Sequence, residues 1–99
     1  MKQAPKDTEV ELLRIANGHS QPVEFRVEPW GEFFSMPAHA SFEVVAQGPP
    51  GDHLEVLFGE GTITVYGWSG SILSVFQKGN LLCECQIPVP SIPQRQPGS

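Results

Sequence analysis

The sequence predicts an all-β domain, folded as a small antiparallel β-sandwich or as a closed barrel of about seven or eight short strands. Apolar residues alternate with polar ones along most of the chain, which is the period of two that half-buried strands show. Turn signals rich in Gly, Pro and Asn separate these runs at roughly every eight to twelve residues. No segment carries a helical apolar stripe of useful length.

The expected strands follow from this alternation in chain order. The clearest one places Val23, Phe25 and Val27 between charged neighbours. Residues 32–36 are doubly aromatic, so their pattern leaves open which side faces the core. The expected strands are residues 8–16, 23–28, 32–36, 41–47, 54–58, 62–66, 71–77 and 81–87.

Three local features refine this pattern. The apolar positions of residues 8–16 change face between Leu12 and Leu13, which predicts a bulge in the first strand. Asn17-Gly18 is typical of a hairpin turn. Residues 62–77 contain two β-rich runs joined by a Gly-Trp-Ser-Gly link, so we expect a second hairpin there.

The length and the end compositions favour one domain with two tails. A chain of 99 residues fits a single domain. Residues 1–7 are polar, and residues 88–99 are rich in proline, which cannot donate regular strand hydrogen bonds. We therefore expect a single β domain at residues 8–87 between two disordered tails.

The chain is acidic, with a formal net charge of −5. The predicted domain holds three basic residues against ten carboxylates, a net charge of −7. Such a surface repels phosphate groups, so nucleic acid and anionic membrane are poor partners. No apolar run approaches the roughly 18 residues of a membrane helix, and the first residues lack the apolar core of a secretory signal. We expect a soluble, cytoplasmic protein.

Several apolar residues fall on the outward side of the predicted strands. A contiguous apolar patch rarely stays bare, so a second sheet, a tail or a partner subunit is expected to cover some of them. A homo-oligomer is one such arrangement. The outward residues are Val45, Leu57, Tyr66, Ile72, Phe76 and Leu82.

Three segments resemble a group of small uncharacterised bacterial all-β proteins. They are residues 27–31 (Val-Glu-Pro-Trp-Gly), residues 42–46 with the proline-led loop before them, and residues 65–71. The resemblance spans residues 10–80 and departs at residues 38–40, where members often carry a Pro-Gly turn. It implies a small β fold and no particular activity. In pattern alone, the chain is also similar to immunoglobulin-like and cupredoxin-like sandwiches.

Two tryptophans suggest a binding surface at one end of the fold. If every connection reverses the chain direction, Trp30, Trp68 and the Pro49-Pro50 turn lie together. Tryptophan rings exposed beside rigid prolines form a binding surface for a protein or a sugar. The alternative is that each ring folds back and fills the end of the sandwich.

The opposite end carries candidate metal ligands. The same reasoning places His19, His39 and Glu60 there, with Cys83 a few residues along the last strand. Imidazole, carboxylate and thiolate groups bind transition metals, so a cupredoxin-like or cupin-like metal site is the second hypothesis. Solvated loop histidines without a metal are the alternative.

Cys83 and Cys85 are expected to point to the same side of the last strand. They could share a metal ion, but the other ligands of a four-ligand zinc site are missing. Their alternation with Leu81 and Ile87 favours two small core residues.

Known catalytic motifs do not fit the chain. Residues 67–71 resemble a nucleophile elbow but lack its final glycine and lead into a strand. Residues 48–51 have prolines where a phosphate-binding loop needs free amide groups. We therefore expect a non-catalytic protein-interaction or structural module without a cofactor, which binds an unknown protein partner or itself. The alternative is a metal-binding β domain.

Overall fold

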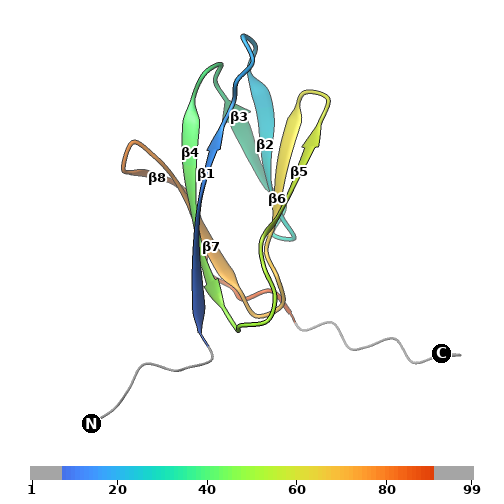
Figure 1. Cartoon of the computed structure of the whole chain (residues 1–99), viewed down its shortest axis with the longest axis vertical. Coiled ribbons are helices and arrows are strands. Elements are labelled where there is room, and N and C mark those ends of the chain that lie inside the picture. The colour runs from blue at the N-terminus through green and yellow to red at the C-terminus, as the bar shows by residue number, and fades with distance from the viewer. Residues whose placement is uncertain (1–7, 91–99) are drawn as a thin grey trace, which may run out of the picture.

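The computed structural model describes residues 8–90, through which eight strands run (Figure 1). The strands are β1 (Glu9–Ala16), β2 (Val23–Glu28), β3 (Glu32–Met36), β4 (Ser41–Gly48), β5 (Glu55–Gly59), β6 (Thr62–Tyr66), β7 (Ile72–Gln77) and β8 (Asn80–Cys85). The predicted all-β class is confirmed. Within residues 8–90, no helix is long and apolar enough to cross a membrane.

The strands form two four-stranded sheets packed as a sandwich, and they do not close into a barrel. The first sheet has the order β1-β4-β7-β8, and the second has the order β3-β2-β6-β5. Neighbouring strands run antiparallel, except that β2 and β6 are parallel. Figure 1 shows the first sheet on the left and the second on the right.

The core lies between the sheets and is built from every second residue of the strands. Phe25 of β2, Phe34 of β3 and Phe42 of β4 form an aromatic cluster with ring centroids between 5.0 and 5.7 Å apart. Full burial of one such ring contributes about 1.5–3 kcal/mol. The other buried apolar strand residues are Ile15, Val23, Val27, Met36, Val44, Ala46, Ile63, Val65, Leu73, Val75 and Cys85.

Residues 62–77 do not form the predicted hairpin. β6 belongs to the second sheet and β7 to the first, so residues 67–71 cross from one sheet to the other. Trp68 fills this crossing and is only 5% exposed. Its backbone N–H donates to Ser71 Oγ at 2.9 Å, and its carbonyl accepts from the Ser71 N–H at 2.9 Å. A hairpin would place this large ring at an exposed loop tip, whereas the crossing buries it.

The connection that begins at Asn17 also crosses between the sheets, so the hairpin predicted there is wrong. Asn17 is buried, and its side-chain amide donates to the carbonyls of Gln21, Met36 and Pro37 at 2.9, 3.3 and 3.2 Å. Its side-chain oxygen accepts from the His19 N–H at 3.0 Å. A buried, fully hydrogen-bonded side chain thus sets this connection.

The bulge predicted in the first strand is absent. β1 pairs with β4 in an unbroken register along its whole length. Leu13 and Ile15 face the core, while Val10 and Leu12 face outward and are 60% and 72% exposed. β1 carries apolar residues on both of its sides. From the sequence alone, such a strand looks the same as a strand with a bulge. A register shift occurs instead where β7 pairs with β8.

Most of the connections lie at the two ends of the sandwich. Residues 17–21, 37–40 and 59–61 lie at the upper end of Figure 1, and residues 48–54 and 67–71 lie at the lower end. Residues 32–36 traverse the sandwich as β3, as the two-ended arrangement requires.

The folded domain extends beyond the predicted boundary at residue 87. Val89 is buried, its N–H donates to the Ser71 carbonyl at 3.0 Å, and its carbonyl accepts from the Gly70 N–H at 2.8 Å. The predicted start of the disordered tail at residue 88 is therefore too early. Val89, although it lies between two prolines, is buried and forms backbone hydrogen bonds. The predicted tail residues 1–7 and 91–99 lie outside the described residues.

Candidate functional site

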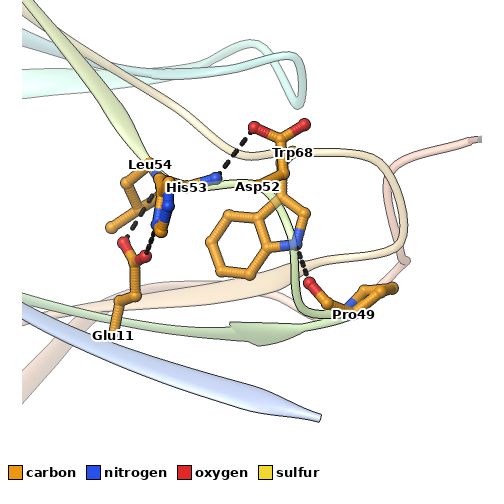
Figure 2. A network of polar contacts seen from close by, with 6 residues as sticks. All are labelled: Glu11, Pro49, Asp52, His53, Leu54 and Trp68. Carbon is orange, nitrogen blue, oxygen red and sulfur yellow. Dashed lines mark hydrogen bonds and ion pairs between the residues drawn. The ribbon is translucent and has the colours of Figure 1, made fainter. Parts of the chain in front are cut away.

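Trp30 lies against the β6–β7 connection that contains Trp68, and both indole N–H groups are bonded within the protein. Trp68 Nε1 donates to the Pro49 carbonyl at 2.7 Å, as Figure 2 shows. Trp30 Nε1 donates to the Ile87 carbonyl at 2.8 Å. Gly67 lies against the Trp30 ring so closely that a Cβ there would come within 2.6 Å of it. Trp68 therefore links the β6–β7 connection to the β4–β5 connection, and Trp30 links the β2–β3 turn to the segment after β8.

Because of this packing, only part of the predicted binding surface is accessible to a partner. Trp68 is buried, so it presents no ring face to a partner. Trp30 is half-buried, and the flanking Pro49 and Pro50 are exposed. Trp68 follows the alternative expectation, in which the ring folds back and fills the end of the sandwich.

The four predicted metal ligands do not come together. His19 and His39 border two different surface depressions at their end of the molecule. Cys83 lies on the edge strand β8, with its sulfur facing Cys85. Within residues 8–90, no group of three ligand atoms includes any of His19, His39, Glu60 or Cys83. The loops of His19 and His39 both cross between the two sheets, whereas the Glu60 turn joins β5 and β6 within the second sheet, so a shared end of the sandwich does not bring these side chains together.

A different acidic and histidine cluster forms at the other end, where the ligand atoms of Glu9, Glu11 and His53 lie within 4.8 Å of one another. Glu11 Oε2 lies 2.6 Å from His53 Nδ1, and Glu11 Oε1 accepts from the Leu54 N–H at 3.2 Å. Figure 2 shows this contact beside Asp52. Both oxygens of Glu11 are thus engaged by the protein, and the carboxylate ties β1 to the connection before β5.

The hydrogen bond shifts the pKa values of both partners. It raises the pKa of His53, with the negative charge of Glu11 as the second cause. It also lowers the pKa of Glu11. The two residues are 42 positions apart, and no pattern in the sequence connects them.

Cys83 and Cys85 face each other on β8, with their sulfurs 3.6 Å apart. Cys85 is buried and Cys83 is half-buried. Burial raises the pKa of both thiols, that of Cys85 to about 12. Neutral thiols are poor nucleophiles, so the pair does not resemble a reactive cysteine site.

The outer side of the first sheet is unusually apolar, and we call it the apolar face. The strand register sets Leu12 opposite Val45, and Phe76 opposite Leu81. Leu12 is 72% exposed and Leu81 is 50% exposed. The residues of the apolar face are Val10, Leu12, Val45, Ile72, Phe76, Leu81 and Leu82.

The outer side of the second sheet is polar by comparison. Its central strands β2 and β6 carry charged residues, threonines and Tyr66 there. Arg26 Nε and Glu24 Oε2 form an ion pair of 3.1 Å. Exposed apolar residues occur on the two edge strands, Phe33 on β3 and Leu57 on β5. The apolar face is therefore a property of one sheet only.

The sequence identified part of this surface. Four of its residues, Val45, Ile72, Phe76 and Leu82, belong to the outward set predicted from alternation. Alternation could not show that they share a sheet with Val10 and Leu12, since β1, β4 and β7 are far apart in the chain.

Comparison with known proteins adds no relative, since no family model, no curated protein and no solved structure matches this chain. The resemblance to small bacterial β proteins therefore stays a prediction.

Proposed function

We propose that this protein is a non-catalytic interaction module that associates with a second copy of itself through the apolar face. The observation that supports this proposal is the exposure of Leu12, Val10 and Leu81 together on one side of one sheet. Burying exposed apolar side chains is the main favourable term in protein association.

The size of the apolar face sets the expected strength of association. Four strands span about 19 Å and five residues along them about 17 Å, so the outer side of the sheet at these positions covers roughly 300 Å², and the apolar face makes up the part of it not occupied by polar side chains such as Arg14 and Glu43. Apolar patches of about 300–600 Å² on monomers often mark interaction sites. A standard stable interface takes about 800 Å² from each partner. We therefore expect a weak, concentration-dependent dimer with a Kd above about 1 μM.

The charge distribution indicates which surface of the protein two copies could bring together with the least repulsion. The described domain carries three basic and ten acidic residues, so two copies repel each other over most of their surface. The outward positions of the first sheet hold only Arg14, Glu43 and Glu84 as charged groups, with a net charge of −1. Repulsion between copies is thus smallest at the apolar face.

A cytoplasmic location is part of this proposal. The supporting feature is the pair of free cysteines, Cys83 and Cys85, since thiols persist in reducing compartments.

Leu12→Lys tests the proposal. A charge at the most exposed leucine of the apolar face would have to be desolvated in the dimer, so we expect dimerisation to weaken at least tenfold. Sedimentation equilibrium of the full chain from micromolar to millimolar concentration measures this change in Kd.

Leu57→Lys is the matched control, because Leu57 is also an outward, exposed leucine on an edge strand, but of the second sheet. We expect this variant to dimerise like the unmodified protein. A monomeric mass at every concentration would contradict the proposal, and so would an equal loss of dimer in both variants.

A further inference from the structure

A depression of about 410 Å³ lies at the upper end of the first sheet, between the β3–β4 loop and the β7–β8 turn. Arg14 and Glu43 line it from paired positions of β1 and β4, and His39, Ser41, Gln77 and Lys78 complete its polar lining. We propose that this cationic depression binds a small organic molecule that carries a phosphate or carboxylate group.

The cationic depression gathers most of the positive charge of the described domain. The described domain has only three basic residues, and two of them, Arg14 and Lys78, line this one depression. The third, Arg26, is paired with Glu24 on the other sheet. Within residues 8–90, neither Arg14 nor Lys78 forms an ion pair. In an acidic protein, two such cations in one hollow attract an anion.

The backbone of the cationic depression adopts an unfavourable conformation at two positions. Within residues 8–90, two non-glycine residues have positive φ, His39 at 63° and Lys78 at 52°, and both line the cationic depression. A side chain in this conformation costs about 1 kcal/mol or more, which glycine would avoid. Such costs cluster at ligand sites, where the side chain itself is needed. Both positions keep a side chain that can donate a hydrogen bond to an anion.

The lining residues define the class of ligand. The guanidinium of Arg14 matches the paired oxygens of a phosphate or carboxylate, and Lys78 adds a point charge. Glu43 beside Arg14 favours a ligand with a hydroxyl or amino group next to its anionic group. The volume suits a small molecule. The cationic depression shares no residue with the apolar face, and Arg14 and Glu43 lie beside that face on the same outer side of the first sheet.

The test is an NMR titration of the labelled full chain with inorganic phosphate, and separately with acetate, at constant ionic strength. We expect saturable shifts at the amides of Ser41, Lys78 and Gly79. Arg14→Gln and Lys78→Asn should each weaken binding roughly tenfold. Asparagine tolerates positive φ, so Lys78→Asn removes the charge without disturbing the turn.

Arg26→Gln is the matched control, since it removes one positive charge outside the cationic depression. We expect its binding to stay within twofold of the unmodified protein. Saturation by phosphate assigns a phosphate ligand, and saturation by acetate alone assigns a carboxylate. Shifts that never saturate with either probe would overturn the proposal, as would an equal loss of binding in Arg26→Gln.

Discussion

The contact between Glu11 and His53 makes one connection of the sandwich sensitive to pH. Its hydrogen bond raises the pKa of His53 above the ordinary 6.5 and lowers that of Glu11 below the ordinary 4.5. The His53 contribution to stability is full below pH 6.5 and is lost as pH rises through the raised value. The Glu11 contribution is full above pH 4.5 and is lost as pH falls through the lowered value.

An NMR pH titration of the His53 ring checks this contact. We expect its pKa to lie above 6.5 and to return toward 6.5 in Glu11→Gln, because the hydrogen bond is the main cause of the shift. Glu60→Gln, at the opposite end of the sandwich, should leave the His53 pKa unchanged. A His53 pKa at or below 6.5 in the unmodified protein would show that the contact does not form in solution.

Trp68 contributes to stability as a core residue. It is 5% exposed, and its indole N–H is bonded to the Pro49 carbonyl. Trp68→Ala should therefore lower the free energy of unfolding by about 3–5 kcal/mol, measured by urea denaturation. Phe33→Ala, which removes a ring that is 66% exposed, should change it by only about 0.5 kcal/mol. A small effect of Trp68→Ala would return this ring to the candidates for partner binding.

Among the connecting elements, the β7–β8 turn shows a mismatch between residue and conformation. Gln77 pairs with Asn80, so Lys78 and Gly79 form a two-residue loop, and both have positive φ, 52° and 81°. This is the type I′ geometry, in which asparagine is preferred at the first position. The sequence predicts a turn here. It does not show that the backbone of Lys78 adopts positive φ, because that depends on which residues of β7 and β8 pair.

Lys78→Asn should stabilise the fold by about 0.5–1 kcal/mol, since asparagine relieves the cost of positive φ. Urea denaturation measures the change. Lys78→Ala is the control, because alanine removes the same charge and keeps the conformational cost. If both variants stabilise equally, the benefit comes from losing the charge and not from the turn.

Strands were predictable as elements, but their pairing was not. The alternation of Val23, Phe25 and Val27 marks β2 because it needs no information from elsewhere in the chain. Residues 62–66 and 71–77 also correspond closely to β6 and β7, yet their connection crosses between sheets. A short link rich in glycine is compatible both with a hairpin and with a crossing between sheets. The crossing buries the Trp68 ring, which a hairpin would leave exposed.

For the whole molecule, charge opposes association and the apolar face favours it. Raising the salt concentration screens repulsion between acidic copies and leaves apolar burial in place. We therefore expect the dimer to strengthen between about 20 mM and 0.5 M sodium chloride, as measured by sedimentation equilibrium. Leu12→Lys should remain largely monomeric at both concentrations. A dimer that weakens with salt would show that charge pairs, and not the apolar face, hold it together.

The sequence by itself determined the all-β class, the approximate position of each strand and most of the inward-facing residues. These properties depend on the local alternation of side chains along an extended backbone. The tertiary structure decided which strands share a sheet, and with that the gathering of Leu12, Val45 and Phe76 on one surface. It also decided that Glu11 meets His53 and that Arg14 and Lys78 line one depression. Such contacts join residues far apart in the chain, because the pairing of strands, and not local sequence, brings them together.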